Sequence, residues 1–411
     1  MSYKFLNAES PAWVAEGLIT EAQRQQLLAR YPPATVPVVG LLPLLGSALV
    51  GLSVVSLVAA NWGSLSVPVR LLLLLGSVGA AFAAGRYFGR RGNRSLGHGL
   101  AALGLLSIGV SIVLIGKMFS QLAAYEAEGL LAWVAVGVAL TFNYRSRLLA
   151  LSTVLIAAAA QTYTAEALGT FSYATAALVA GGLGWFWWRR PDALVASVLA
   201  TGVLWQAAVW VAFSHSKITW FFVPAMLIYA LGDWAVDRPA GRALQGPPLV
   251  SAYLFALGLA LFGQTTEYAG LLRPAPLPYL GALAAVLALS AAGKRAQGRL
   301  VSLPDWLLLL PGYYLPGGLP LAIATIVVLY AHAGSVLARA GQDAERLTLG
   351  TVLFIVATMT AFFKLTWAFL DKSLFFLLGG ILLLGLSWLL RRRNARLLAK
   401  LTIHAAASEK S

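Results

Sequence analysis

The residues of this chain that could do chemistry stand where long apolar runs end. Asn61 and Trp62 close one such run, and Arg70 lies just inside the next one, beside Pro68. Arginine at the mouth of an outward-facing pocket would suit a carboxylate or phosphate ligand. In the alternative, Arg70 extends to the membrane interface beside Trp62 and anchors the turn without binding anything.

A second polar group follows the third apolar run. Lys117 and Gln121 are spaced four apart, so they share one face if that helix continues past the membrane. Glu126 and Glu128 come next, and two positions apart they diverge on a helix and converge only on an extended segment. This favours partners for nearby cations over a paired acid and base, and a solvated acidic loop is the alternative.

Glu166 is the next acid expected at the outer end of the bundle. Polar groups at membrane depth are costly and often functional, so these positions define the predicted site. The predicted substrate-binding residues are Asn61, Trp62, Arg70, Lys117, Gln121, Glu126, Glu128 and Glu166.

Asp305 belongs to a different pattern, near the inner end of an apolar stretch and directly after Pro304. The backbone is interrupted again between Pro311 and Gly318. Short segments broken by proline and glycine line the sites of many transporters. A tight hairpin between two ordinary membrane spans explains the same residues.

The elements that must position these side chains are apolar helices. Only 11% of the 411 residues are charged and 59% are apolar, whereas about a quarter of a soluble domain is charged. The apolar residues come in long blocks, which predicts helices that are apolar on every side and lie in lipid. We therefore expect an all-α polytopic integral membrane protein, in the bacterial cytoplasmic membrane.

The composition also excludes several classes of protein. A net charge of +15 would suit nucleic acid, but the basic residues lie between apolar runs, as cytoplasmic loops require. The lipid bilayer is thus the expected partner, with no nucleic acid. Cysteine is absent, the four histidines are scattered, and no nucleotide-binding loop or nucleophile motif is present. We expect no metal and no cofactor.

Three regions follow from the hydropathy pattern. Residues 1–37 form a cytoplasmic two-helix headpiece, 38–390 a transmembrane bundle of about fourteen helices, and 391–411 a basic cytoplasmic tail. In the headpiece, Thr20 and Gln23 form a capping box, Gly17 ends the first helix, and Leu18 is expected in a small apolar core. The expected spans are 38–60, 67–86, 96–119, 129–143, 147–165, 170–188, 193–213, 218–236, 248–264, 277–293, 300–315, 317–338, 348–364 and 372–390.

Two of these spans, 129–143 and 300–315, are weak because one is short and the other holds prolines and Asp305. The distribution of basic residues between the two sides of the membrane supports keeping both spans in the count. With both termini cytoplasmic, all but six of the 30 basic residues fall inside, and dropping either span would send the later basic loops to the wrong side. The basic residues expected outside are Arg70, Lys117, Lys217, Arg273, Lys364 and Lys372. Glycines at 97, 99, 104 and 109 predict close helix packing.

Several short motifs in the N-terminal third resemble a known family. They are Gly17-Leu18-Ile19-Thr20-Glu21-Ala22-Gln23, Ala59-Ala60-Asn61-Trp62, Arg70, and Leu114-Ile115-Gly116-Lys117. Together they resemble the bacterial predicted-membrane-protein family called domain of unknown function 2157. Its members tend to carry glutamine at the position of Lys117. The family has no established activity, so the resemblance implies architecture and singles out Asn61, Trp62 and Arg70, but no catalytic residue.

The function expected from these residues is that of a transporter or permease. An outward-facing polar pocket with basic and amide groups would favour an anionic or lipid-linked substrate. The first alternative is a membrane-embedded transferase on lipid-linked substrates, with Glu126, Glu128 or Glu166 as base, although every outer loop is short for such an enzyme. The second alternative is a scaffold that binds a partner through the headpiece and the basic tail. An enzyme is the less favoured class.

Overall fold

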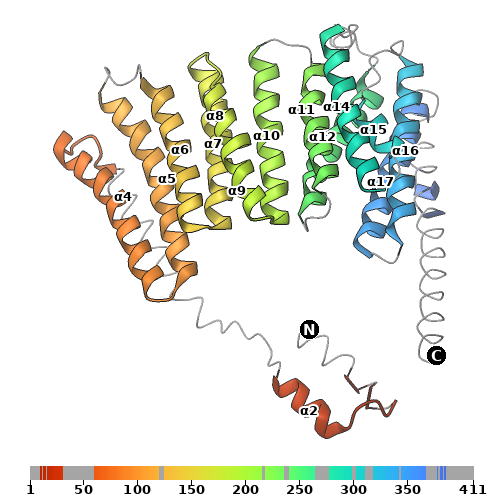
Figure 1. The fold of residues 1–411 in the computed structure, drawn as a ribbon, viewed down its shortest axis with the longest axis horizontal. Helices are drawn as coiled ribbons and strands as arrows, with labels where there is room; N and C mark the ends of the chain where they lie inside the picture. The colour runs from red at the N-terminus through yellow and green to blue at the C-terminus, as the bar shows by residue number, and fades with distance from the viewer. Residues whose placement is uncertain are drawn as a thin grey trace. The chain divides into compact units, whose positions relative to one another are not determined.

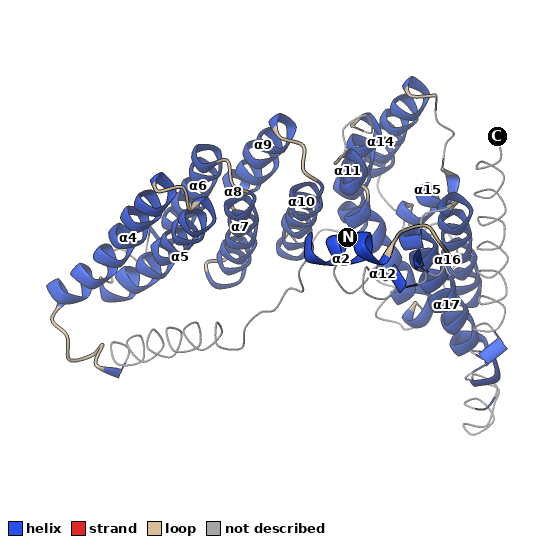
Figure 2. Cartoon of the chain, turned by 90° about the horizontal axis from the view of Figure 1, so that it is seen from below, coloured by secondary structure: helices blue, strands red, loops and turns tan. Residues whose placement is uncertain are grey.

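The fold was obtained as a computed structural model. It describes residues 10–11, 13–14, 16–30, 60–119, 125–214, 218–235, 240–263, 277–298, 302–310, 318–341 and 344–366, with 377, 380–382 and 384–385 near the C-terminus. Among these residues every regular element is a helix (Figures 1 and 2). The all-α class expected from the sequence is confirmed.

The chain divides into two compact units, residues 1–73 and 74–411. The first unit holds helix α2 (Glu21–Arg30) and the start of α4 (Val67–Arg90). The second holds the rest of α4 and the helices that follow it. These are α5 (Arg94–Met118), α6 (Glu126–Tyr144), α7 (Arg147–Ala167), α8 (Tyr173–Ala177), the π-helix η2 (Leu178–Leu183), α9 (Gly184–Arg189), α10 (Ala193–Phe213), the 3₁₀ helix η3 (Ile218–Phe221), α11 (Phe222–Trp234), η4 (Gly241–Leu244), α12 (Gly246–Phe262), α14 (Leu277–Ala296), α15 (Leu303–Leu309), α16 (Leu319–Ala340) and α17 (Ala344–Thr366).

The headpiece begins α2 with the capping box that the sequence predicts. The backbone N–H of Gln23 donates to Thr20 Oγ1 over 3.2 Å, and the backbone N–H of Thr20 donates to Gln23 Oε1 over 2.9 Å. Gly17 has a φ of 74°, a left-handed conformation suited to a helix end. The prediction that Leu18 joins a small core is wrong, because its side chain is 68% exposed.

Nine helices of the described residues are long and apolar enough to cross a membrane. Large apolar side chains such as Leu155, Leu254 and Val327 are 59–69% exposed on them, as lipid-facing residues are. In the second unit, Figure 1 shows α5, α6, α7 and α10 standing side by side, each one packed against the next. The chain is a membrane protein with multiple apolar helices.

The two weak spans turn out differently. The span 129–143 is the full helix α6, 19 residues long and one of the nine. The span 300–315 contains α15, which has only seven residues, and positions 311–317 lie outside the described residues. The span 170–188 is built from α8, η2 and α9 in succession. Most of the spans 38–60 and 372–390 also lies outside the described residues.

Candidate functional site

The most unusual feature of the second unit is a buried ion pair between α11 and α14. Lys294 Nζ lies 2.6 Å from Asp233 Oδ1, and the two side chains are 4% and 0% exposed. Asp233 also accepts hydrogen bonds from Ser290 Oγ at 2.6 Å and from Gln245 Nε2 at 2.8 Å. A buried carboxylate is stable only when its lone pairs are satisfied in this way.

A second buried carboxylate, Asp305, lies at the start of α15. Arg339 of α16 donates to both of its oxygens, over 3.0 and 3.1 Å. His332 Nδ1 lies 2.9 Å from Asp305 Oδ1, and Ser302 Oγ donates to Oδ2 over 2.6 Å. This carboxylate therefore collects an imidazole, a guanidinium and a hydroxyl from two separate elements.

The Tyr229 hydroxyl joins the two centres. It donates to Asp305 Oδ2 over 3.0 Å and accepts from Lys294 Nζ over 3.2 Å. The result is one continuous chain of hydrogen bonds, which we call the charge network. It runs through Asp233, Lys294, Tyr229, Asp305, His332 and Arg339.

Helical spacing places these side chains. Tyr229 and Asp233 are four apart on α11, as Ser290 and Lys294 are on α14, so each pair shares one helix face. Small residues permit the close approach of these helices. A Cβ on Gly293 would lie 2.9 Å from the Trp234 ring and 3.3 Å from the Asp233 Cβ.

The network lies at one end of the helices that build it. Lys294 and Arg339 stand in the last turns of α14 and α16, and Asp305 stands in the first turn of α15. These three charges have the sign that the helix dipole favours at that terminus, whereas Asp233, in the last turn of α11, does not and relies on Lys294 instead. Figures 1 and 2 show α11, α14, α15 and α16 gathered in the C-terminal part of the second unit. The loops beyond this end are those that positive-inside counting assigns to the cytoplasm.

The network reaches the surface through Arg339. The Arg339 side chain is 49% exposed, whereas the Asp305 side chain to which it donates is 2% exposed and that of His332 is 5% exposed. A polar path thus leads from solvent or headgroups at this end to a carboxylate in the interior.

The residues predicted at the outer turn form local contacts. An Nη of Arg70 donates to the Gly63 carbonyl over 2.9 Å, and the Arg70 guanidinium lies 5.7 Å from the centre of the Trp62 ring. The Asn61 carbonyl accepts from the Ser64 hydroxyl over 2.8 Å. These contacts, all in the first unit, hold the turn closed as the anchoring interpretation requires.

The other predicted residues are dispersed. Glu126 accepts from the Tyr163 hydroxyl over 3.1 Å and packs against Gly116. Lys117, Glu128 and Glu166 are exposed and form no ion pair with a described residue. Gln121 lies outside the described residues.

Asp305 is the member of the charge network that stands out in the sequence, because it follows Pro304 within an apolar stretch. Asp233 stands inside the predicted span 218–236, and an acid within a span is the signal that could have found it. Lys294 and Arg339 fall in expected cytoplasmic loops, and His332 is one of four scattered histidines. Asp233 and Lys294 are 61 positions apart, and their pairing depends on which helices are neighbours.

Comparison with known proteins places the N-terminal part of the chain. No curated protein and no solved structure matches the chain. The charge network, from residue 229 to residue 339, lies beyond the region that a family model covers. Residues 11–150 match the family described as predicted membrane protein, DUF2157, in agreement with the motifs around Thr20, Asn61 and Gly116.

Proposed function

We propose that this protein is a transporter of the bacterial cytoplasmic membrane in which the charge network is the proton-coupling site. The single observation that carries the proposal is the position of Asp305. Its carboxylate, in the first turn of the seven-residue α15, is 2% exposed and is shared between His332 and Arg339 of α16, a helix with the length and composition of a membrane span. Ionisable groups buried among membrane-spanning helices are expensive and mark ion or proton pathways.

The charge balance of the network supports this role. Two carboxylates, Asp233 and Asp305, face two cations, Lys294 and Arg339, so the network is neutral when His332 is neutral. Histidine exchanges a proton readily near neutral pH. One proton on His332 gives the buried network a net positive charge, which costs free energy in a low-dielectric interior. That cost is the means by which proton binding can drive a change of conformation or the entry of an anion.

The surroundings of Asp305 support the same function. Pro304 opens α15, and this helix has seven residues, too few to cross a membrane. Short helical segments interrupted by proline or glycine form the substrate and ion sites of secondary transporters. The anionic or lipid-linked substrate expected from the sequence remains part of the proposal.

A proton-uptake assay in proteoliposomes tests the proposal without knowledge of the substrate. Vesicles contain a pH-sensitive dye, and a potassium gradient with valinomycin sets an inside-negative potential. We expect the protein to acidify the interior and Asp305→Asn to abolish the acidification.

Asp192→Asn is the matched control. Asp192 pairs with the exposed Arg147 at 2.7 Å and caps α10 through a bond from Val195 N–H, which asparagine can also accept. Equal acidification by Asp305→Asn and by Asp192→Asn would refute the proposal.

A further inference from the structure

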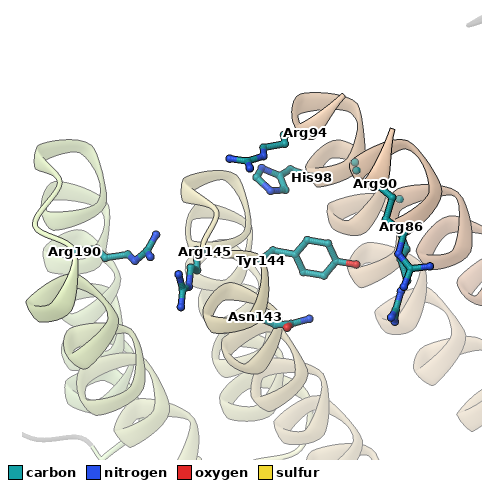
Figure 3. A pocket seen from close by; sticks show the side chains of 11 residues that line it. Arg86, Arg90, Arg94, His98, Asn143, Tyr144, Arg145 and Arg190 are labelled. Atoms are coloured by element: carbon teal, nitrogen blue, oxygen red, sulfur yellow. The ribbon is translucent and has the colours of Figure 1, made fainter. Parts of the chain in front are cut away.

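Five arginines line a pocket of about 690 Å³ in the second unit, at a distance along the chain from the charge network. Figure 3 shows Arg86 and Arg90 on one side of the pocket, Arg94 and His98 at its rim, and Arg145 with Arg190 on the opposite side. They come from three different turns, between α4 and α5, between α6 and α7, and after α9. The volume is in the range of pockets that hold small ligands.

Glycines bring helices α4 and α5 into backbone contact. A Cβ on Gly97 would lie 2.8 Å from the Gly85 carbonyl oxygen and 3.0 Å from Gly89 Cα. No side chain larger than hydrogen fits there without a shift of the backbone. This contact sets Arg86 and Arg90 of α4 beside the first turn of α5.

Polar groups other than arginine complete the lining. The His98 and Tyr144 rings meet edge to face, with centroids 6.0 Å apart, and tie α5 to α6 inside the pocket. Figure 3 shows the Tyr144 hydroxyl directed toward Arg86. Asn143 contributes an amide. These groups can donate hydrogen bonds beside the guanidinium groups.

Arg145 occupies a backbone conformation that disfavours it. It is the one non-glycine residue with positive φ among those described, at 51°, where α6 ends. Helices commonly end in this conformation with glycine, because a Cβ is strained there. The chain carries an arginine at this position despite the local strain.

The pocket contains no acid, and none of its five arginines forms an ion pair with a described residue. Arginines just outside it are occupied. Arg91 stacks on Tyr87 at 4.5 Å, and Arg189 stacks on Trp185 at 4.8 Å. Arg147 pairs with Asp192. Within these turns, the arginines that share the concave surface are thus the ones with neither an ion pair nor a stacked aromatic ring among the described residues.

We propose that the arginine pocket, lined by Arg86, Arg90, Arg94, Arg145 and Arg190, binds a phosphate-bearing anion. Guanidinium groups match phosphate oxygens two at a time. Positive-inside counting puts this end of the bundle at the cytoplasmic leaflet, where basic pockets between helices take anionic headgroups. The ligand is the phosphate of such a headgroup or a free phosphate, since both present the same oxygens.

A general excess of basic residues at a cytoplasmic surface would attract anions without any pocket. Neighbouring arginines separate the two explanations. Arg90 and Arg190 line the pocket, whereas Arg91 and Arg189, adjacent to them in the chain, lie on aromatic rings outside it. Arg90→Gln/Arg190→Gln and Arg91→Gln/Arg189→Gln remove the same charge from the same turns.

Binding is measured directly on the full chain in neutral detergent, independently of transport. One arm titrates short-chain phosphatidylglycerol against phosphatidylcholine with the same acyl chains. The other arm titrates inorganic phosphate at constant ionic strength. Tight binding in the first arm identifies a lipid headgroup, and tight binding in the second identifies a free phosphate. Either result supports the proposal.

Each arginine that contacts the anion is expected to raise the binding affinity by about a factor of five. Arg90→Gln/Arg190→Gln should weaken binding by about 30-fold, and Arg91→Gln/Arg189→Gln should leave it within about twofold of wild type. Equal losses in the two double variants would overturn the proposal. So would the absence of saturable binding of either probe by the wild-type chain.

Arg145→Gly provides a second variant that protects the test from misfolding. Glycine suits the φ of 51°, so the fold should be at least as stable while one pocket arginine is lost. We expect binding about fivefold weaker with an unchanged or higher melting temperature. Unchanged affinity in this variant would contradict a role for Arg145 in the pocket.

Discussion

Asp305 and Arg339 form a pair in which one partner is buried and the other is half in solvent. Arg339 donates two hydrogen bonds, of 3.0 and 3.1 Å, to a carboxylate that is 2% exposed, while the Arg339 side chain is 49% exposed. A buried ion pair usually isolates its charges from water. This pair instead connects the charge network to one end of the helices.

Arg339→Lys tests the importance of the two-point contact. Lysine keeps the charge but presents one ammonium group in place of a planar fork, so it cannot hold both carboxylate oxygens in the same way. We expect the free energy of unfolding to fall by about 1 kcal/mol. Arg295→Lys, on an exposed position of α14, is the control and should leave the melting temperature unchanged. Equal melting temperatures for the two variants would show that the fork is irrelevant to stability.

The Asp233–Lys294 pair allows stability to be separated from proton movement. Lys294→Met leaves Asp233 without its buried cation, which typically costs about 3–5 kcal/mol of unfolding free energy. Lys294→Met/Asp233→Leu should recover most of that loss, because apolar replacement of a buried pair is often neutral. Unfolding in detergent measures both variants.

In the same double variant, proton uptake should stay lost although the fold is restored. If the network served only to hold the helices together, proton uptake would return when stability is restored. Recovery of proton uptake together with stability would therefore contradict the coupling role of the pair.

The glycines of α5 test the packing that shapes the arginine pocket. Gly97→Ala places a methyl group 2.8 Å from a backbone oxygen of α4, and overpacking of this kind costs about 1–3 kcal/mol. A Cβ on Gly99 would meet no neighbouring helix within 4 Å, so Gly99→Ala is the matched control and should be neutral or stabilising. Thermal unfolding of the two variants makes the comparison. A loss of stability in Gly99→Ala equal to that in Gly97→Ala would contradict the assigned packing.

The sequence predicts where the helices lie better than it predicts which helices are neighbours. Lipid exposure makes apolar blocks long, so the helices from α4 to α17, except the seven-residue α15, could be predicted within a few residues from local pattern. The glycine-rich face of α5 predicted close packing, and Gly97, Gly104 and Gly109 contact neighbouring helices closely, whereas Gly99 does not. Local spacing cannot say which of four glycines meets another helix.

The pairing of residues in the charge network could not be predicted either, because it also depends on which helices are neighbours. Asp305 stands 76 positions from Tyr229, and both stand on helices whose neighbours no local pattern specifies. The distribution of basic residues assigned Lys294 and Arg339 to loops, because a basic residue in the last turn of a helix has the same sequence signature whether it faces headgroups or a buried carboxylate. Two local signals were present: Pro304, which pointed to Asp305, and the position of the acid Asp233 inside a predicted span.

A substitution of Arg70 tests whether the outer turn is only an anchor or forms a ligand site. Because it bonds the Gly63 carbonyl and stacks on Trp62, Arg70→Gln should speed amide hydrogen exchange in the turn 61–66. Hydrogen exchange with mass spectrometry measures this rate. Unchanged exchange would contradict the anchoring role, and loss of solute uptake with unchanged exchange would assign Arg70 to the predicted outer pocket.

The most direct test of the proposed coupling site is a pH step applied to the protein on a solid-supported membrane. Proton binding to the buried network moves charge across the membrane and gives a transient current. We predict this current for the wild-type chain and for Asp192→Asn, and its loss in His332→Gln, which keeps a polar side chain beside Asp305 but cannot exchange the proton. A His332→Gln current equal to that of the wild type would contradict the account.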